Sequence, residues 1–104
     1  MTKVAVVFAD GFEEIEALSP VDVFRRAGFD CSMLGLESAS VTGSHGIQVT
    51  MDGVFDGNLD EYDLVVLPGG MPGSTKLRDH QDLIASLQEV AKAGKYVAAI
   101  CAAP

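Results

Sequence analysis

Val4-Ala-Val-Val-Phe-Ala9 is a continuous apolar run rich in β-branched side chains. Such a run is typical of a strand covered on both faces, as in a parallel sheet. Asp10-Gly11 ends the run, and the acids from Glu13 to Glu16 then open a helix, because a helix N-terminus favours negative charge. Arg25-Arg26-Ala27-Gly28 ends that helix with basic residues in the last turn and a glycine after it. The chain therefore begins as a strand followed by a helix.

The same alternation continues to the end of the chain. We predict further strands over residues 30–36, 47–49, 64–67 and 96–100, a loop over 51–62 and a short helical turn over 73–77. Asp79 is the expected N-cap of a helix that reaches Ala93. One face of this helix should carry the apolar residues Leu83, Ile84, Leu87, Val90 and Ala91. Strands that alternate with helices imply right-handed crossovers, so the expected class is α/β with a parallel sheet.

The composition limits the classes of partner. The 104 residues fit one domain, 48% of them are hydrophobic, and the net charge is −8. An acidic chain of this kind argues against nucleic acid and against an anionic membrane surface. No apolar run approaches the ~20 residues that cross a bilayer, and Met1-Thr2-Lys3 leads straight into the first strand without a signal peptide. We therefore expect a cytoplasmic protein.

Three segments follow the carboxyl ends of predicted strands: Asp10–Glu16, Pro68–Gly73 and the residues from Cys101 onward. Parallel α/β sheets bind ligands in the crevice outside these strand ends. Cys101 follows the apolar strand Val97–Ile100 and precedes small residues, as a nucleophile on a sharp strand-to-helix turn does. The alternative is a buried structural cysteine, since alanines stand where the usual turn has glycines.

Two further groups fit chemistry at Cys101. The Gly70 and Ala102 N–H groups could form an oxyanion hole, although Gly69-Gly70 is equally read as a simple turn. A Glu16 carboxyl placed against a thiolate would keep its proton, and could then hydrogen-bond the sulfur or move a proton. The alternative is that Glu13, Glu14 and Glu16 are only solvated acids of the first turn.

The remaining polar residues are not expected to take part in catalysis or to bind a metal. His45 lies in a predicted turn and His80 stands next to the predicted cap, so neither is expected to be catalytic. No Cys/His/carboxylate set has ligand spacing, and no phosphate-binding glycine motif occurs, so we expect neither a metal nor a cofactor. Cys31 is expected to be a partly buried residue of the second strand.

Four segments carry a resemblance to a known family, and in order and spacing they are together highly specific. The chain resembles the ThiJ/PfpI superfamily, in particular its parkinsonism-associated protein deglycase branch. This resemblance implies a flavodoxin-like three-layer α/β sandwich with a mostly parallel sheet, and a homodimer. The four segments are Asp10-Gly-Phe-Glu-Glu-Ile-Glu16, Pro20-Val-Asp-Val-Phe-Arg-Arg-Ala-Gly28, Tyr62-Asp-Leu-Val-Val-Leu-Pro-Gly-Gly70 and Ala98-Ala-Ile-Cys-Ala-Ala-Pro104.

The resemblance also implies a site. Cys101 matches the family's reactive elbow cysteine, which oxidises readily to sulfinic acid, and Glu16 matches the protonated acid that hydrogen-bonds it. Gly70 and Ala102 match the backbone donors of the oxyanion site. The protease-like members carry a histidine directly after the cysteine, where this chain has Ala102, so a peptidase is disfavoured. The general base of the related branch would lie beyond Pro104.

The implied function is cofactor-independent glyoxalase or deglycase chemistry on methylglyoxal or early glycation adducts. One alternative is a redox-sensing stress protein or chaperone that responds to oxidation of Cys101. A weaker alternative is an amidotransferase-like domain. Many bacterial members carry a thiamine-biosynthesis label, but nothing in this sequence is built to hold a thiazole phosphate.

Residues 1–104 are expected to be the N-terminal portion of a single domain of this type, incomplete in this chain, because the elbow still needs its helix. The remainder is expected on a separate or missing C-terminal segment, which would act as a partner of this one. Without it, the apolar faces of Val4–Ala9, Leu64–Leu67 and Val97–Ile100 should be partly uncovered.

Overall fold

The structure is a computed structural model that describes residues 2–100. Its strands are β1 (Lys3–Phe8), β2 (Asp30–Gly35), β3 (Ser40–Thr42), β4 (Gln48–Thr50), β5 (Gly53–Val54), β6 (Leu64–Leu67) and β7 (Tyr96–Ala99), and its helices are α1 (Glu14–Arg26), α2 (Gly73–Asp79) and α3 (Gln81–Lys92). Five parallel strands form the central sheet in the order β5-β2-β1-β6-β7. β3 and β4 form a separate antiparallel hairpin.

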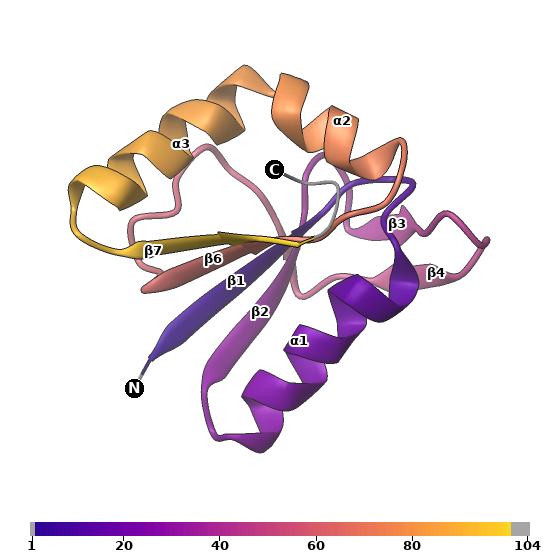
Figure 1. Ribbon diagram of the computed structural model, residues 1–104, viewed down its shortest axis with the longest axis horizontal. Helices are drawn as coiled ribbons and strands as arrows, with labels where there is room; N and C mark the ends of the chain where they lie inside the picture. The colour runs from indigo at the N-terminus through magenta and orange to yellow at the C-terminus, as the bar shows by residue number, and fades with distance from the viewer. Residues whose placement is uncertain (1, 101–104) are drawn as a thin grey trace.

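Helices cover both faces of the sheet, which makes three layers (Figure 1). On one face, Ala5 and Val7 of β1 belong to a core that includes Leu83 and Val90 of α3. On the other face, the alternate β1 residues belong to a core with Ala17 and Val21 of α1. This alternation of the central strand between two cores explains why its sequence is apolar throughout. The predicted α/β class with a parallel sheet is confirmed.

The expectation of uncovered apolar faces is wrong for β1, holds in part for β6, where Leu64 and Leu67 are half-buried, and holds at β7. Every residue from Val4 to Phe8 is 0% exposed, and Val65 of β6 is also 0% exposed. The helices on both faces already cover these strands. At β7, Tyr96 is 74% exposed and Val97 is 41% exposed. Of the three strands named in that expectation, β7 is therefore the most open.

The start of α3 differs from the prediction. His80, not Asp79, is the N-cap, and its Nδ1 accepts a hydrogen bond from the Leu83 N–H at 3.1 Å. Asp79 is instead the last residue of α2. The His80 ring also packs edge-to-face on Phe55, with centroids 5.8 Å apart, and this packing favours histidine in the capping position.

The buried face of α3 also differs from the predicted stripe. Leu83 and Val90 are buried, but Ile84 is 38% exposed and Ala91 is exposed. Ser86 occupies the inner face, where its hydroxyl donates a hydrogen bond to the Gly57 carbonyl at 2.9 Å. A buried polar residue with a partner is well tolerated, which is why apolar periodicity alone misplaced this face.

Two short strands were not predicted. β3 is a polar three-residue strand, and β5 has only two residues, which pair with Leu34 and Gly35 of β2. Runs of this length carry no recognisable periodicity. Among residues 2–100, no helix is both long and apolar enough to cross a membrane.

Candidate active site

Two of the three predicted strand-end segments lie against each other. The Glu13 N–H donates to the Gly69 carbonyl at 2.9 Å, and the Gly73 N–H donates to the Gly11 carbonyl at 3.3 Å. The third segment approaches through Ile100, whose N–H donates to the Leu67 carbonyl at 3.0 Å. Hydrogen bonds therefore bring the chain up to the position directly before Cys101 at the same edge of the sheet. Cys101 and Ala102 themselves lie outside the described residues.

Gly70 occupies a position that only glycine fits. Its φ is +101°, and a Cβ there would lie 2.8 Å from the Phe12 carbonyl carbon and 2.9 Å from the Gly11 oxygen, and would also meet the Glu13 nitrogen. The loop after β6 thus packs directly on the loop before α1. Among residues 2–100, the Gly70 N–H donates to no backbone acceptor. It is therefore available to a group outside this range.

Glu16 lies in the first turn of α1 with its side chain partly buried. Its N–H donates to the Glu13 Oε2 at 2.8 Å, so Glu13 is the N-cap of the helix. The Glu16 Oε1 atom is buried and has no hydrogen-bond partner among residues 2–100. Buried carboxyl oxygens normally have a partner. This oxygen is thus suited to a thiol, a ligand or a water at the sheet edge.

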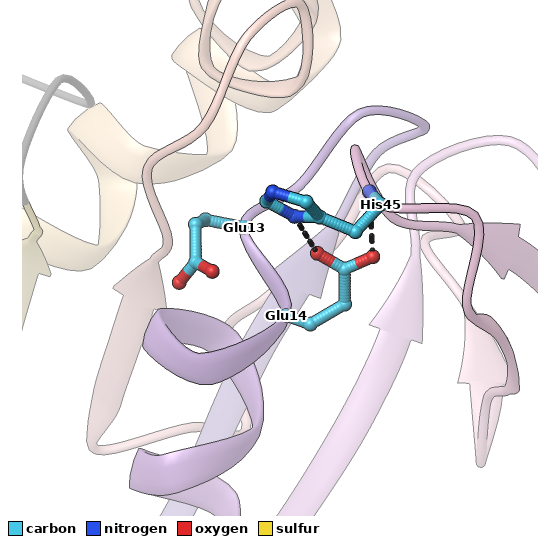
Figure 2. A group of neighbouring side chains, drawn as sticks. All are labelled: Glu13, Glu14 and His45. Carbon is cyan, nitrogen blue, oxygen red and sulfur yellow. Dashed lines mark hydrogen bonds and ion pairs between the residues drawn. The ribbon is translucent and has the colours of Figure 1, made fainter.

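Glu14 and His45 form a contact that the sequence did not reveal. Glu14 is only 5% exposed, so its assignment as a solvated first-turn acid is wrong. Its Oε2 accepts the His45 N–H at 2.8 Å and its Oε1 accepts the His45 Nδ1–H at 3.0 Å (Figure 2). The Ile47 N–H also donates to Oε2, at 3.4 Å. A Cβ at Gly43 would overlap the Glu14 carboxylate. In the sequence, only the glycines on either side of His45, Gly43 and Gly46, hinted that this turn packs closely on another segment.

The electrostatics of this pair follow from its contacts. Burial raises the pKa of Glu14, but the hydrogen bonds from the His45 imidazole and from the backbone outweigh it and lower the pKa to about 2. The same hydrogen bond and the negative charge of Glu14 raise the pKa of His45. The pair therefore ties the β3–β4 hairpin to the start of α1 as an ion pair when His45 is protonated.

The surroundings of Cys31 decide whether its thiol can react. Cys31 lies in β2, as predicted, but at 6% exposed it is buried and not partly buried. Burial raises the pKa of its thiol, although the neighbouring Arg25 charge acts in the opposite direction. A buried thiol with a raised pKa is a poor nucleophile. Cys31 is thus a structural residue and no rival to Cys101.

A cleft of about 380 Å³ opens at the same edge of the sheet. The end of β1, the segment from Leu36 to Val41 and the helix α2 line it, and His80 closes one side. The His80 Nδ1 already accepts the Leu83 N–H, so the proton of the neutral ring is on Nε2. His80 is therefore a capping residue that also lines the cleft.

A sequence model of the DJ-1/PfpI family matches residues 2–104. The chain belongs to the DJ-1/PfpI family. Its relatives include a deglycase of Thermococcus kodakarensis, 34% identical over 98% of this chain and 61% of that protein, and the Arabidopsis thaliana protein DJ-1 homolog B, 36% identical over 98% of this chain and 24% of that protein. The solved structure of oxidised Toxoplasma gondii DJ-1 superposes with a TM-score of 0.94 at 40% identity, over 100% of this chain and 58% of that one.

Membership of the DJ-1/PfpI family confirms the resemblance read from the four segments and the flavodoxin-like sandwich that it implied. The chain spans about three-fifths of the length of the Thermococcus deglycase and of the Toxoplasma DJ-1 chain. The shared part contains both described site residues, Glu16 and Gly70.

Proposed function

We propose that the whole protein is a cysteine-dependent glyoxalase or deglycase that acts on reactive aldehydes, such as methylglyoxal or early glycation adducts, without an added cofactor. The observation that carries this proposal is the buried Oε1 of Glu16, which has no hydrogen-bond partner among residues 2–100, at the edge that Ile100 reaches. The available Gly70 N–H at the same edge adds to it. Deglycases among the relatives support the same class of chemistry.

The reaction starts with attack of the Cys101 thiolate on the aldehyde carbon, which forms a C–S bond and a hemithioacetal oxyanion. The Gly70 and Ala102 N–H groups stabilise that oxyanion. The aldehyde C–H proton then leaves, and a proton returns to the neighbouring carbonyl carbon, so the first carbon is oxidised as the second is reduced. Water cleaves the resulting thioester to a hydroxy acid and restores the thiol. Glu16 moves protons at the sulfur and the oxygen.

The test is methylglyoxal consumption by the intact protein and by Cys101→Ser. Cys101→Ser should abolish activity, while the matched variant Cys31→Ser should keep it, because Cys31 is buried away from this edge. Glu16→Gln should lower the rate at least about 100-fold, the smaller end of general acid–base contributions. Full activity in Cys101→Ser would refute the mechanism.

A second candidate is a redox sensor or chaperone switch. The relative whose structure was solved in an oxidised form favours it. Peroxide would oxidise the Cys101 thiolate to sulfenic and then sulfinic acid, with each step reducing one peroxide to water. Client binding should then change in step with the mass gain at Cys101. Binding that is indifferent to oxidation would exclude the switch.

We also propose that the protein is a cytoplasmic homodimer. Two exposed apolar side chains support the dimer: Ile15 is 73% exposed and Ile47 is 52% exposed. They lie on neighbouring elements, since Glu14 precedes Ile15 and accepts the Ile47 N–H. Ile15→Asp in the intact protein should shift its mass in sedimentation toward the monomer, and an unchanged mass would place the interface elsewhere.

A further inference from the structure

Three potential metal ligands meet at the start of α1, apart from the groups assigned to the aldehyde reaction. Glu13, Glu14 and His45 each offer one ligand atom, and these atoms all lie within 4.8 Å of one another (Figure 2). The two glutamates precede and open α1, and the histidine comes from the hairpin turn 31 residues after Glu14. This separation explains why no ligand spacing is visible in the sequence.

Backbone groups already orient the two carboxylates. One oxygen of Glu14 accepts the His45 and Ile47 N–H groups, and one oxygen of Glu13 accepts the Glu16 N–H. The second oxygen of Glu14, Oε1, faces the His45 ring at 3.0 Å, and an ion between them would replace that hydrogen bond. Hydrogen bonds from outer groups are what hold the first ligands of a metal in place. The absence of a side chain at Gly43 lets the hairpin turn sit directly on the Glu14 carboxylate.

We propose that Glu13, Glu14 and His45 bind one divalent transition-metal ion of the Zn²⁺ type. Carboxylate oxygen and imidazole nitrogen are both zinc ligands. Two carboxylates and a neutral imidazole carry the charge that offsets the 2+ of the ion. The Glu14 Oε1 and His45 Nδ1 lie 3.0 Å apart, close to the roughly 3.3 Å between tetrahedral zinc ligands.

Binding exchanges one proton for the ion. When His45 is protonated, Zn²⁺ takes the place of its Nδ1 proton, which leaves to solvent while Nε2 keeps its own proton, and no electron is transferred. The His45 side chain is 72% exposed, so the remaining coordination positions are open to water. Without Glu13, the same contacts are only a hydrogen-bonded pair. The participation of Glu13 is therefore what separates a metal site from a structural clamp.

The test is a Zn²⁺ titration by calorimetry on the intact protein, in the Cys101→Ser background so that the elbow thiol cannot bind the ion. Matched variants are His45→Asn and His80→Asn, which remove the two histidines of this chain one at a time. Asparagine is a good N-cap, so His80→Asn keeps the start of α3. His45→Asn should weaken binding at least about 100-fold, Glu13→Gln at least about tenfold, and His80→Asn should have no effect.

A second measurement guards against loss of folding in the variants. Zn²⁺ added to protein that keeps Glu13, Glu14 and His45 should shift the NMR signals of the His45 ring and leave those of His80 unchanged. Proton release on binding, measured in two buffers of different ionisation enthalpy, should fall in His45→Asn. Equal affinity in His45→Asn and His80→Asn, or no saturable binding at all, would overturn the proposal. The outcome of these metal-binding tests does not depend on whether the protein has aldehyde activity.

Discussion

Replacement of Gly70 by alanine tests the close approach that builds the candidate oxyanion site. A left-handed backbone at φ +101° costs an alanine about 1–2 kcal/mol. The added Cβ would also press on backbone atoms of Phe12 and Gly11 at 2.8 and 2.9 Å, and such overpacking costs about 1–3 kcal/mol more. Gly70→Ala should therefore lower the free energy of unfolding by about 2–5 kcal/mol, measured by urea denaturation of the intact protein.

Gly28→Ala is the matched control. Gly28 has a similar φ of +87°, but a Cβ there meets nothing within 4 Å, so only the backbone cost of about 1–2 kcal/mol applies. The difference between the two variants isolates the contact between the loops. Gly70→Ala should also reduce methylglyoxal consumption, because relief of the clash moves the Gly70 N–H. Equal losses of stability in the two variants would refute the packing argument.

Three further predictions concern the rest of the domain. With a chelator present, the stabilising contribution of the Glu14–His45 pair should be complete between about pH 4.5 and 6.5. It should decline in acid as Glu14 is protonated toward its folded pKa of about 2, and decline again as the pH rises through the raised pKa of His45. Urea unfolding midpoints measured across this pH range should show the plateau, and Glu14→Gln should remove the decline in acid. Leu83→Ala, at a residue 0% exposed, should cost about 2–5 kcal/mol in urea denaturation, whereas a similar loss for Ile84→Ala would contradict the observed face of α3. Cys31 should react with iodoacetamide far more slowly in the folded protein than in urea, as followed by mass spectrometry, and equal rates would show that it is not protected.

The sandwich could be predicted because its signals are local. The strand at Val4 and the helix after Asp10 appear in the sequence as an apolar run and as a charge pattern, and both lie where expected. The glycines of the loop after β6 likewise mark a close approach of backbone. Local signals therefore located the edge of the sheet at which Glu16 and Gly70 lie, while the chemical roles of these two residues stay a prediction.

Glu14 could not be predicted for the opposite reason. In the sequence it is one of four acids between Asp10 and Glu16, with nothing to set it apart. Its burial depends on a hairpin turn 31 residues later, which is a tertiary contact. The same holds for His80, where packing on Phe55 selects one of two polar residues as the cap. Contacts between distant segments decide these roles.

The Glu14 clamp also has a consequence for the candidate active site. The hairpin touches the loop before α1 at further points, since the Gly11 N–H donates to the Thr42 carbonyl and the Ser44 N–H donates to the Phe12 carbonyl, both at 2.8 Å. The opposite side of that loop holds the Gly69 carbonyl through the Glu13 N–H. The loop is thus fixed between the hairpin and the residues that present the Gly70 N–H. Glu14 and Asp10, whose Oδ1 accepts the Thr42 N–H at 3.0 Å, are the charged side chains in this set of contacts. We therefore expect Glu14→Gln to loosen the support of the loop that presents the Gly70 N–H.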